Sequence, residues 1–321
     1  MNDFIISEIA DSTNRQSDLH FPFGRSAVLK RTLALIFSRY LGGLRSGNRF
    51  EAEGMIVTGL SGSGKTQEVS HLIKRFNTSS APLPSGGSAR FAECMLEGRI
   101  SWKDLGIKTL EALGYHVSNR ARETQTTIWD RVVFQMKAQG FVGIYYDEAQ
   151  HIFRGKSDQE QSVILDSFKT LLKSRDWPFM LIVSGVPELT GYVEKEVQLS
   201  RLLTPVRFES ISMADDLELV HEVVGSFAIE NGIRVADDLA SEDFYSRLAT
   251  AAALRWGLLI YLTVNAILSV KEKGASDLTR ENFVDAWVGK TNMQRFVNPF
   301  THDSYLSLFR PDNPFKVSMP T

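Results

Sequence analysis

The eight residues 59–66, which read GLSGSGKT, constrain the fold most strongly because they fit the pattern G-x-x-x-x-G-K-[ST] in full. A short β-rich run at 55–58 precedes them, and a helical pattern follows at 66–76. Glycines in such a loop let backbone N–H groups curl around phosphate oxygens, and the N-terminus of the following helix adds positive potential. The segment therefore predicts a strand, a phosphate-binding loop and a helix in that order.

The last two residues of this loop indicate a nucleoside triphosphate and a metal ion. Lys65 is expected to reach the β- and γ-phosphates, and the Thr66 hydroxyl is expected to bind Mg²⁺. ATP and Mg²⁺ are therefore the cofactors that the sequence predicts. The residues expected to bind them are Gly59, Ser61, Gly62, Ser63, Gly64, Lys65, Thr66, Gln67 and Asp147.

A second motif lies further along the chain, where the apolar run 142–146 ends in Asp147 and Glu148. Ligands of parallel sheets bind at the carboxyl ends of the strands. Asp147 would hold the Mg²⁺ shell, directly or through water, and Glu148 would polarise the attacking water as a general base. Taken alone, the same pattern fits an ordinary strand–helix junction with a capping aspartate.

The remaining pattern predicts an α/β fold with a parallel sheet of about five strands. The strand-type runs are continuously apolar and alternate with helices, which is typical of a sheet covered on both faces. The strands are expected at 55–58, 89–94, 142–146, 179–183 and 206–208. The helices around them are expected at 26–44, 66–76, 101–113, 126–139 and 159–175.

From about residue 214 the pattern changes to helices alone, which predicts a small all-helical lid domain. Its helices are expected at 214–231, 241–251, 254–273 and 279–290. The predicted division of the chain is an N-terminal extension (1–24), an α/β nucleotide-binding domain (25–212), the helical lid (213–292) and an extended C-terminal tail with aromatic anchors (293–321).

Composition excludes several classes of protein. Lys and Arg total 36 against 38 acidic residues, a net charge of −2, so the chain is not a polycation that coats nucleic acid by charge alone. Cys94 is the single cysteine, which excludes a disulfide framework and a cysteine-rich zinc site. The first ten residues lack a basic signal-peptide region, and the most apolar run, 258–268, is too short to span a bilayer. A cytoplasmic protein without a membrane partner is expected.

Three further residues are candidates for the reaction. Ser184 ends the fourth strand, where it could touch the γ-phosphate or the attacking water, or could simply be a small residue before a turn. Arg201 precedes the fifth strand and could project into the nucleotide of a neighbouring subunit, with Arg207 as the second choice. Arg255 opens a long helix of the lid and could reach back to the phosphates. Each arginine has the alternative of being a plain surface charge.

Taken in order, these features resemble an AAA+ ATPase over roughly residues 20–290. Three segments, FGR at 23–25, YDEAQH at 146–151 and GVPEL at 185–189, further resemble the TniB/TnsC group of transposition regulators. The resemblance implies ATP-dependent rings or helical filaments on duplex DNA, formed by copies of the chain. It also implies recruitment of a transposase, with a TniQ-type adaptor in many members, and the tail is the predicted docking segment. The tail could equally fold back on the lid.

Residues 99–137 are the candidate DNA-binding region, because they hold seven basic against four acidic residues. The resemblance places this region along the inner channel of a ring. Arg99, Lys103, Arg120 and Arg122 are the predicted contacts to DNA phosphates, which would be independent of sequence and sensitive to salt. The alternative for each is a solvated helix face.

Two other functions remain open. The chain could be a signalling or defence NTPase of the STAND type, in which nucleotide exchange acts as a switch without DNA. It could also be a relative of replication initiators or helicase loaders. This second alternative ranks lower, because the roughly 30 residues after 290 are too few for the winged helix that such proteins commonly add. A DNA-cleaving activity is not expected.

Overall fold

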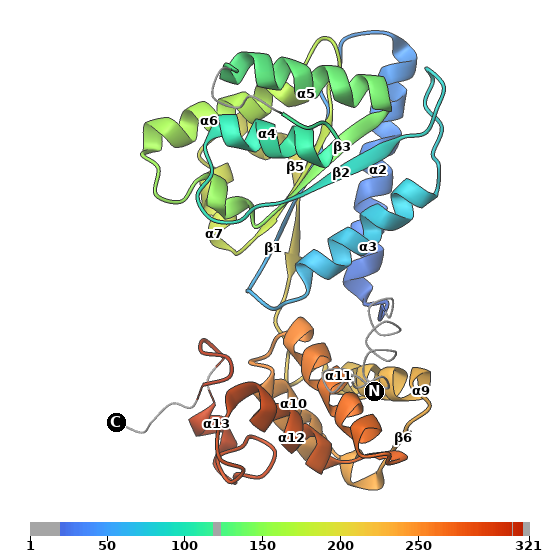
Figure 1. Cartoon of the computed structure of the whole chain (residues 1–321), viewed down its shortest axis with the longest axis vertical. Helices are drawn as coiled ribbons and strands as arrows, with labels where there is room; N and C mark the ends of the chain where they lie inside the picture. The colour runs from blue at the N-terminus through green and yellow to red at the C-terminus, as the bar shows by residue number, and fades with distance from the viewer. Residues whose placement is uncertain (1–19, 118–122, 310, 317–321) are drawn as a thin grey trace. The chain divides into compact units, whose positions relative to one another are not determined.

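The computed structural model describes residues 20–117, 123–309 and 311–316. Contacts divide the chain into two units, shown in Figure 1. The α/β unit consists of Phe23–Ser61 and Lys65–Phe208, and the helical unit is built on the residues from Glu209 onward, with Gly62–Gly64 grouped with it.

The α/β unit is built on a five-stranded parallel sheet in the order β2-β3-β4-β1-β5. The strands are β1 Gly54–Gly59, β2 Arg90–Met95, β3 Phe141–Asp147, β4 Met180–Gly185 and β5 Leu203–Phe208. The register pairs Thr58 with Gly185, Met95 with Asp147 and Tyr146 with Val183. The carboxyl ends of β1, β3 and β4 therefore meet at one edge. The predicted parallel sheet is confirmed.

Helices cover both faces of this sheet, with α2 and α3 on one face and α4, α5 and α6 on the other (Figure 1). Their bounds are α2 Gly24–Ser46, α3 Lys65–Thr78, α4 Trp102–Ala112, α5 Gln125–Gln139 and α6 Asp158–Leu172. Crossover helices of this kind bury both faces of a parallel sheet. The three central strands are accordingly buried at every residue, whereas the edge strands β2 and β5 have exposed positions.

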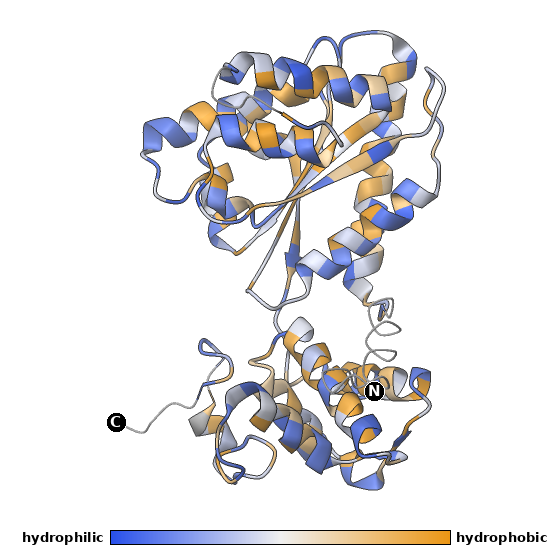
Figure 2. Ribbon diagram, in the orientation of Figure 1, coloured by the Kyte–Doolittle hydropathy of each residue, from blue (hydrophilic) through white to orange (hydrophobic). Residues whose placement is uncertain are grey.

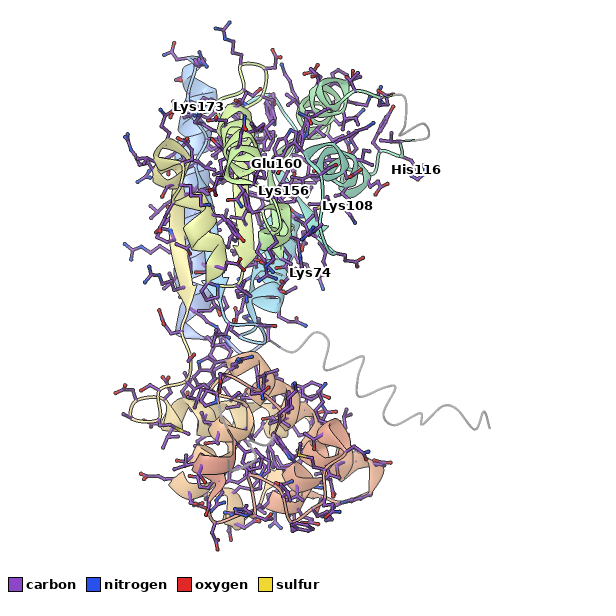
Figure 3. The ribbon with its side chains drawn as sticks, turned by 90° about the vertical axis from the view of Figure 1, so that its left-hand side faces the viewer. Lys74, Lys108, His116, Lys156, Glu160 and Lys173 are labelled. Carbon is purple, nitrogen blue, oxygen red and sulfur yellow. The ribbon has the colours of Figure 1, made fainter. Side chains whose placement is uncertain are left out.

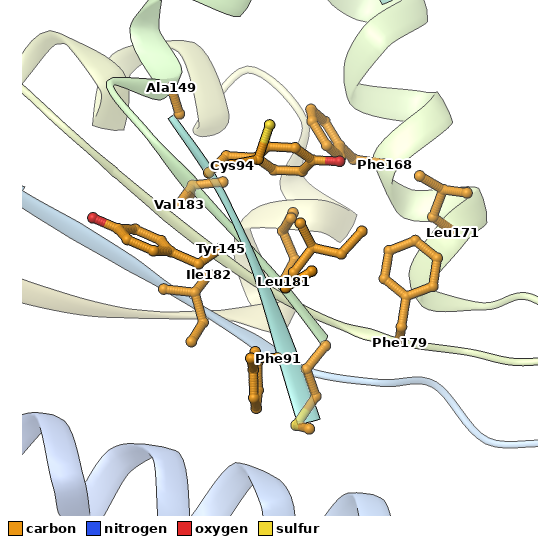
Figure 4. Packing of buried hydrophobic residues seen from close by; sticks show 14 of the residues in the cluster. Phe91, Cys94, Tyr145, Ala149, Phe168, Leu171, Phe179, Leu181, Ile182 and Val183 are labelled. Carbon is orange, nitrogen blue, oxygen red and sulfur yellow. The ribbon is translucent and has the colours of Figure 1, made fainter. Parts of the chain in front are cut away.

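Figure 2 shows that the strands of the sheet are largely hydrophobic, and the close-up in Figure 4 shows that their side chains lie on both sides of the sheet. Leu181 faces Phe168 and Phe179, while Tyr145 and Ile182, which are register partners, lie on the opposite side (Figure 4). Continuous burial explains why these strands are apolar at successive positions instead of every second one.

Four elements of the α/β unit, two of them predicted and two not, show where the structure differs from the sequence prediction. Strand β5 begins at Leu203 rather than at 206, because Pro205 lies on an edge strand, where its missing N–H costs no ladder bond. Helix α6 ends at Leu172 rather than at 175, and the Leu172 carbonyl accepts a hydrogen bond from Ala52 N at 2.8 Å. Two short helices, α7 Glu188–Val193 and α8 Val197–Leu202, were not predicted, because six residues do not repeat a helical pattern.

The helical unit contains four longer helices. They are α9 Leu217–Glu230, α10 Glu242–Ala251, α11 Trp256–Glu272 and α12 Arg280–Thr291. The prediction of helices alone was wrong in one detail, since β6 Arg234–Val235 pairs in parallel with β7 Asp277–Leu278. Arg234 and Asp277 form a two-pronged ion pair at 2.7 Å on this ladder. Strands of two residues carry no periodicity from which they could be predicted.

The C-terminal segment was expected either to be extended or to fold back on the lid, and its described part folds back. Phe300 is fully buried and its ring packs against Phe244 and Phe283, while Phe309 packs edge-on against Trp287. A short helix, α13 Tyr305–Leu308, lies between these two anchors. Apolar burial by the aromatic anchors folds the segment back onto the helical unit.

Among the described residues, no single helix is long and apolar enough to cross a membrane. Only α10 and α11 taken together, which meet at a bend of 109°, have sufficient length and apolar character.

Candidate nucleotide site

The loop between β1 and α3 has the backbone that its glycines allow. Gly62 and Gly64 have φ angles of 83° and 93°, which are strained for residues with a Cβ. Lys65 begins α3 and is buried, and its Nζ donates to the carbonyls of Gly59 at 2.9 Å and Leu60 at 3.1 Å. Its ammonium group therefore lies over the loop, where the sequence predicted that a phosphate would be held.

A hydrogen-bonded chain of side chains joins the ends of α3, β3 and β4. Thr66 Oγ1 donates to Asp147 Oδ2 at 2.6 Å, and Ser184 Oγ donates to Asp147 Oδ1. Tyr145 and Ser184 also share a hydrogen bond at 2.9 Å. Asp147 and Ser184 are buried, so each polar group needs the partner that it has. The structure thus brings together three residues that the sequence predicted separately.

Tyr145 was not predicted as part of this site. Burial raises the pKa of its hydroxyl above the ordinary value, and the nearby Asp147 carboxylate acts in the same direction. The hydroxyl therefore stays protonated next to Ser184. A tyrosine inside an apolar strand gives no sequence signal of this role, because only the pairing of β3 with β4 places it there.

Glu148 follows Asp147 directly and has a left-handed backbone with φ of 54°. Its N–H donates to Asp147 Oδ1 at 2.9 Å, and its carboxylate accepts from Gln150 Nε2. Gln150 lies with His151 in a short 3₁₀ helix, Ala149–Ile152. Gln150 lies within the motif at 146–151, which predicts no role for it, so the structure adds a residue to the site.

The described residues fit ATP and Mg²⁺ by their chemistry. No group of three or more His, Cys, Asp or Glu among the described residues could hold a metal ion. Mg²⁺ needs no such group, because it binds one or two protein oxygens together with waters and substrate phosphates. Thr66 and Asp147 offer these oxygens. The hydroxyl of Ser63 is buried without a hydrogen-bond partner in the part of the chain that the structure describes, and it can donate to a phosphate oxygen.

The first turn of α2 is tied to α3, the helix that follows the loop. Arg25 forms an ion pair with Glu68 of α3 at 3.7 Å, and Ser26 Oγ donates to the same carboxylate at 2.8 Å. The Arg25 guanidinium also lies between the rings of Phe23 and Phe208, 4.2 and 4.6 Å from their centres. Burial lowers the pKa of Arg25, and the Glu68 carboxylate opposes this shift. The ion pair with Glu68 therefore stabilises the positive charge of the buried guanidinium.

The three candidate arginines lie in different surroundings. Arg201 is exposed in the last turn of α8, directly before the edge strand β5, and Arg207 is exposed on β5 itself. Arg255 is buried at the N-cap of α11, and its Nη2 donates to the Pro311 carbonyl at 3.0 Å. Burial lowers the pKa of Arg255. Within the helical unit Arg255 therefore contacts the C-terminal segment.

Two of the four predicted DNA contacts can be placed. Arg99 is exposed and lines a groove of about 530 Å³ together with Lys156 and Glu160. Figure 3 labels Lys156 and Glu160. Lys103 lies half-buried in the first turn of α4. Arg120 and Arg122 lie outside the described residues.

Comparisons with known proteins agree with this architecture. Residues 48–193 match a protein family described as an AAA domain. The ORC1 protein of Aeropyrum pernix, solved in complex with DNA, is 16% identical with a TM-score of 0.57, over 82% of this chain and 64% of that chain. The fold is that of the AAA+ proteins. The predicted AAA+ fold is thus confirmed, with its parallel sheet and its helical C-terminal region.

Two further solved structures are similar to this chain. The ADP form of the Aeropyrum pernix ORC2 protein is 16% identical with a TM-score of 0.58, over 84% of this chain and 68% of that chain. Cdc6p from Pyrobaculum aerophilum is 12% identical with a TM-score of 0.56, over 82% and 66%. At these identities the likeness shows the fold alone.

This chain spans less than two thirds of the length of the ORC1 protein. A search of curated proteins finds no match. The resemblance to the TniB/TnsC group stays a prediction.

Proposed function

We propose that this AAA+ protein hydrolyses ATP at the edge formed by β1, β3 and β4. The hydrogen bond of 2.6 Å between Thr66 Oγ1 and Asp147 Oδ2 carries the proposal. It brings the hydroxyl that follows the phosphate-binding lysine against the buried carboxylate at the end of β3. These are the two oxygen donors that a P-loop ATPase uses around Mg²⁺, and the bound ion neutralises charge on the phosphates.

The residues around this pair then have distinct tasks. Lys65 and the backbone of the loop bind the phosphates, while Ser184 lies close enough to Asp147 to fix that carboxylate. Glu148 accepts a proton from a water molecule. The oxygen of that water forms a bond to the γ-phosphorus of ATP while the bond between this phosphorus and the ADP oxygen breaks. Both carboxylate oxygens of Asp147 accept side-chain hydrogen bonds, from Thr66 and from Ser184, whereas Gln150 bonds to one oxygen of the Glu148 carboxylate, so Glu148 is assigned as the base.

ATP turnover by purified protein tests this assignment. Glu148→Gln should bind ATP with unchanged affinity and hydrolyse it at least about 100-fold more slowly, since a general base contributes about 10²–10⁴ in rate. Glu97→Gln, an exposed glutamate in the loop after β2, is the matched control and should behave as wild type. Normal turnover by Glu148→Gln would reject the assignment of the base.

We further propose that ATP binding controls assembly on duplex DNA, as in the transposition regulators that the sequence resembles. The ORC1 protein, which shares this fold, was solved in complex with DNA. Arg99 and Lys103 supply positive charge near the start of α4 and suit contacts to the DNA backbone. Arg201, exposed beside an edge strand, is the residue proposed to contact the nucleotide of a neighbouring copy. Recruitment of a transposase, with or without a TniQ-type adaptor, completes this proposal.

A binding assay with duplex DNA separates this role from the signalling switch. Affinity is measured with Mg²⁺ and either a slowly hydrolysed ATP analogue or ADP, at two salt concentrations. Binding should require the ATP analogue and weaken with salt, because counterions are released from the phosphates. Arg99→Glu should weaken it at least about tenfold, while Arg31→Glu, an exposed arginine on α2, should not. Absence of DNA binding in both nucleotide states would favour the signalling switch.

A further inference from the structure

Gln150 links two parts of the candidate site through the two ends of its side-chain amide. Its Nε2 donates to the carboxylate of Glu148, and its Oε1 accepts from the backbone N–H of Val186 at 3.3 Å. Gln150 is 1% exposed, so water cannot replace either partner. The amide therefore connects Glu148 to the chain that leaves β4, two residues after Ser184.

Glu148 is held from its backbone as well as from its carboxylate. A φ of 54° is uncommon for a residue with a Cβ and persists where the surroundings fix it. The Glu148 N–H bonds to Asp147 Oδ1 at 2.9 Å, and the Glu148 carbonyl accepts from His151 N at 3.0 Å. With both the backbone and the carboxylate tethered, the side chain of Glu148 has a defined direction.

Gly185 makes the room that this link needs. A Cβ built on Gly185 would overlap Gln150 Oε1 and approach Leu189 Cδ2 to 3.1 Å. Gly185 is not among the residues with positive φ, so the backbone of this strand end accepts other residues. Space for the Gln150 amide is what requires glycine here.

We propose that Gln150 is a positioning residue for hydrolysis, which orients the Glu148 carboxylate and ties it to the end of β4. The proposal rests on the proposed function, because it takes Glu148 as the general base. Ser184 and Val186 belong to the same stretch, and Ser184 is bonded to Asp147. A movement of this strand end is therefore transmitted to both carboxylates, to Asp147 through Ser184 and to Glu148 through Gln150.

Gln150→Met tests the link, because methionine keeps the length of the side chain and removes both hydrogen bonds. The kcat for ATP should fall about 10–100-fold, as expected for a misplaced reacting group, with the ATP dissociation constant changed less than threefold. Gln161→Met is the matched control, since Gln161 is a buried glutamine of α6 that donates to the Lys156 carbonyl at 3.0 Å. It should leave kcat within threefold of wild type.

The double variant Glu148→Gln/Gln150→Met separates positioning from a structural role. If Gln150 acts only through Glu148, the double variant should hydrolyse ATP no more slowly than Glu148→Gln alone. A further loss of ATP affinity or of folded protein in the double variant would show that Gln150 supports the unit as a whole, and would overturn the proposal.

Gly185→Ala displaces the same amide without removing it, and it remains informative if Gln150→Met does not fold. Its kcat should fall in the same range, whereas Gly191→Ala on α7, where a Cβ meets nothing within 4 Å, should have no effect. Unchanged kcat in Gln150→Met or in Gly185→Ala, with Glu148→Gln inactive, would overturn this proposal alone. An active Glu148→Gln would instead overturn the assignment of the base on which it rests.

Discussion

The edge of the parallel sheet and the aromatic core of the helical unit bury side chains of opposite character. At the sheet edge the buried groups are Asp147, Ser184 and Gln150, and each is bonded to another polar group. In the helical unit the rings of Phe244, Phe283 and Phe300 are fully buried against one another.

Burial of polar groups costs desolvation that their hydrogen bonds roughly offset, whereas burial of aromatic rings is favourable. The polar residues at the sheet edge are therefore placed for chemistry, and the aromatic residues of the helical core stabilise the fold. Substitutions in the first should change activity at small cost in stability, and substitutions in the second should do the reverse.

Phe300→Ala tests the helical side of the comparison most strongly. The ring is fully buried, and its removal leaves a cavity that should cost about 3–5 kcal/mol of unfolding free energy. Chemical denaturation measures the loss. Phe296→Ala is the control, because the Phe296 ring is 69% exposed and should cost little. Equal effects of the two variants would mean that the C-terminal segment does not anchor the helical unit in solution.

Lys65→Ala tests the sheet edge. Removal of the ammonium group should weaken ATP binding at least about 100-fold, equivalent to about 2.7 kcal/mol, because no other cation on the loop faces the phosphates. Titration with a fluorescent ATP analogue measures the affinity, and denaturation without nucleotide should show a much smaller change. If Lys65→Ala lost stability but kept its ATP affinity, Lys65 would serve the stability of the fold and not the binding of phosphate.

The parts of the molecule that the sequence predicted best are those set by local patterns. The loop at 59–66, the three central strands and the pair Asp147–Glu148 follow from residues that are neighbours in the chain. Their glycines, continuous apolar runs and strand-end carboxylates each have a direct physical reading.

The parts that escaped prediction depend on contacts between distant segments. Gln150 acquires a role because Val186 folds next to it, and Tyr145 because β3 pairs with β4. The aromatic contacts of the helical unit could not be predicted for the same reason, since Phe300 and Phe244 are 56 positions apart in sequence. One sequence shows which residue types are present, but the topology decides which of them meet.

Arg247→Met asks whether polar groups in the helical unit also serve stability. Arg247 Nη1 donates to the carbonyls of Pro299 at 3.1 Å and His302 at 2.9 Å, which hold the C-terminal segment beside Phe300. Loss of these bonds should cost about 1–3 kcal/mol with no change in ATP affinity. Arg234→Met, which breaks the ion pair with Asp277 at the protein surface, should have a much smaller effect on stability, because solvent screens such a pair. Lower ATP affinity in Arg247→Met would show that the two units are coupled.

Tyr145→Phe has the smallest expected effect and separates stability from chemistry within one strand. It removes the hydrogen bond to Ser184, and Tyr146→Phe removes the bond of 2.6 Å to Thr109 on the other face of β3. Each should cost about 0.5–1.5 kcal/mol at neutral pH, measured by denaturation. Of the two variants, Tyr145→Phe should change ATP turnover, because its partner Ser184 is bonded to Asp147, whereas the partner of Tyr146 is Thr109.

Titration to alkaline pH gives the same pair a second readout. Burial raises the pKa of Tyr145 and of Tyr146 above the ordinary value of 10. Above pH 10 the unfolded chain loses these protons before the native protein does, so the native protein loses stability as the pH rises. Each variant should therefore lose less stability than wild type between pH 10 and 11. If stability fell with pH as steeply in Tyr145→Phe as in wild type, the Tyr145 hydroxyl of the wild-type protein would be accessible to water. The edge of the sheet would then be more hydrated than its hydrogen bonds indicate.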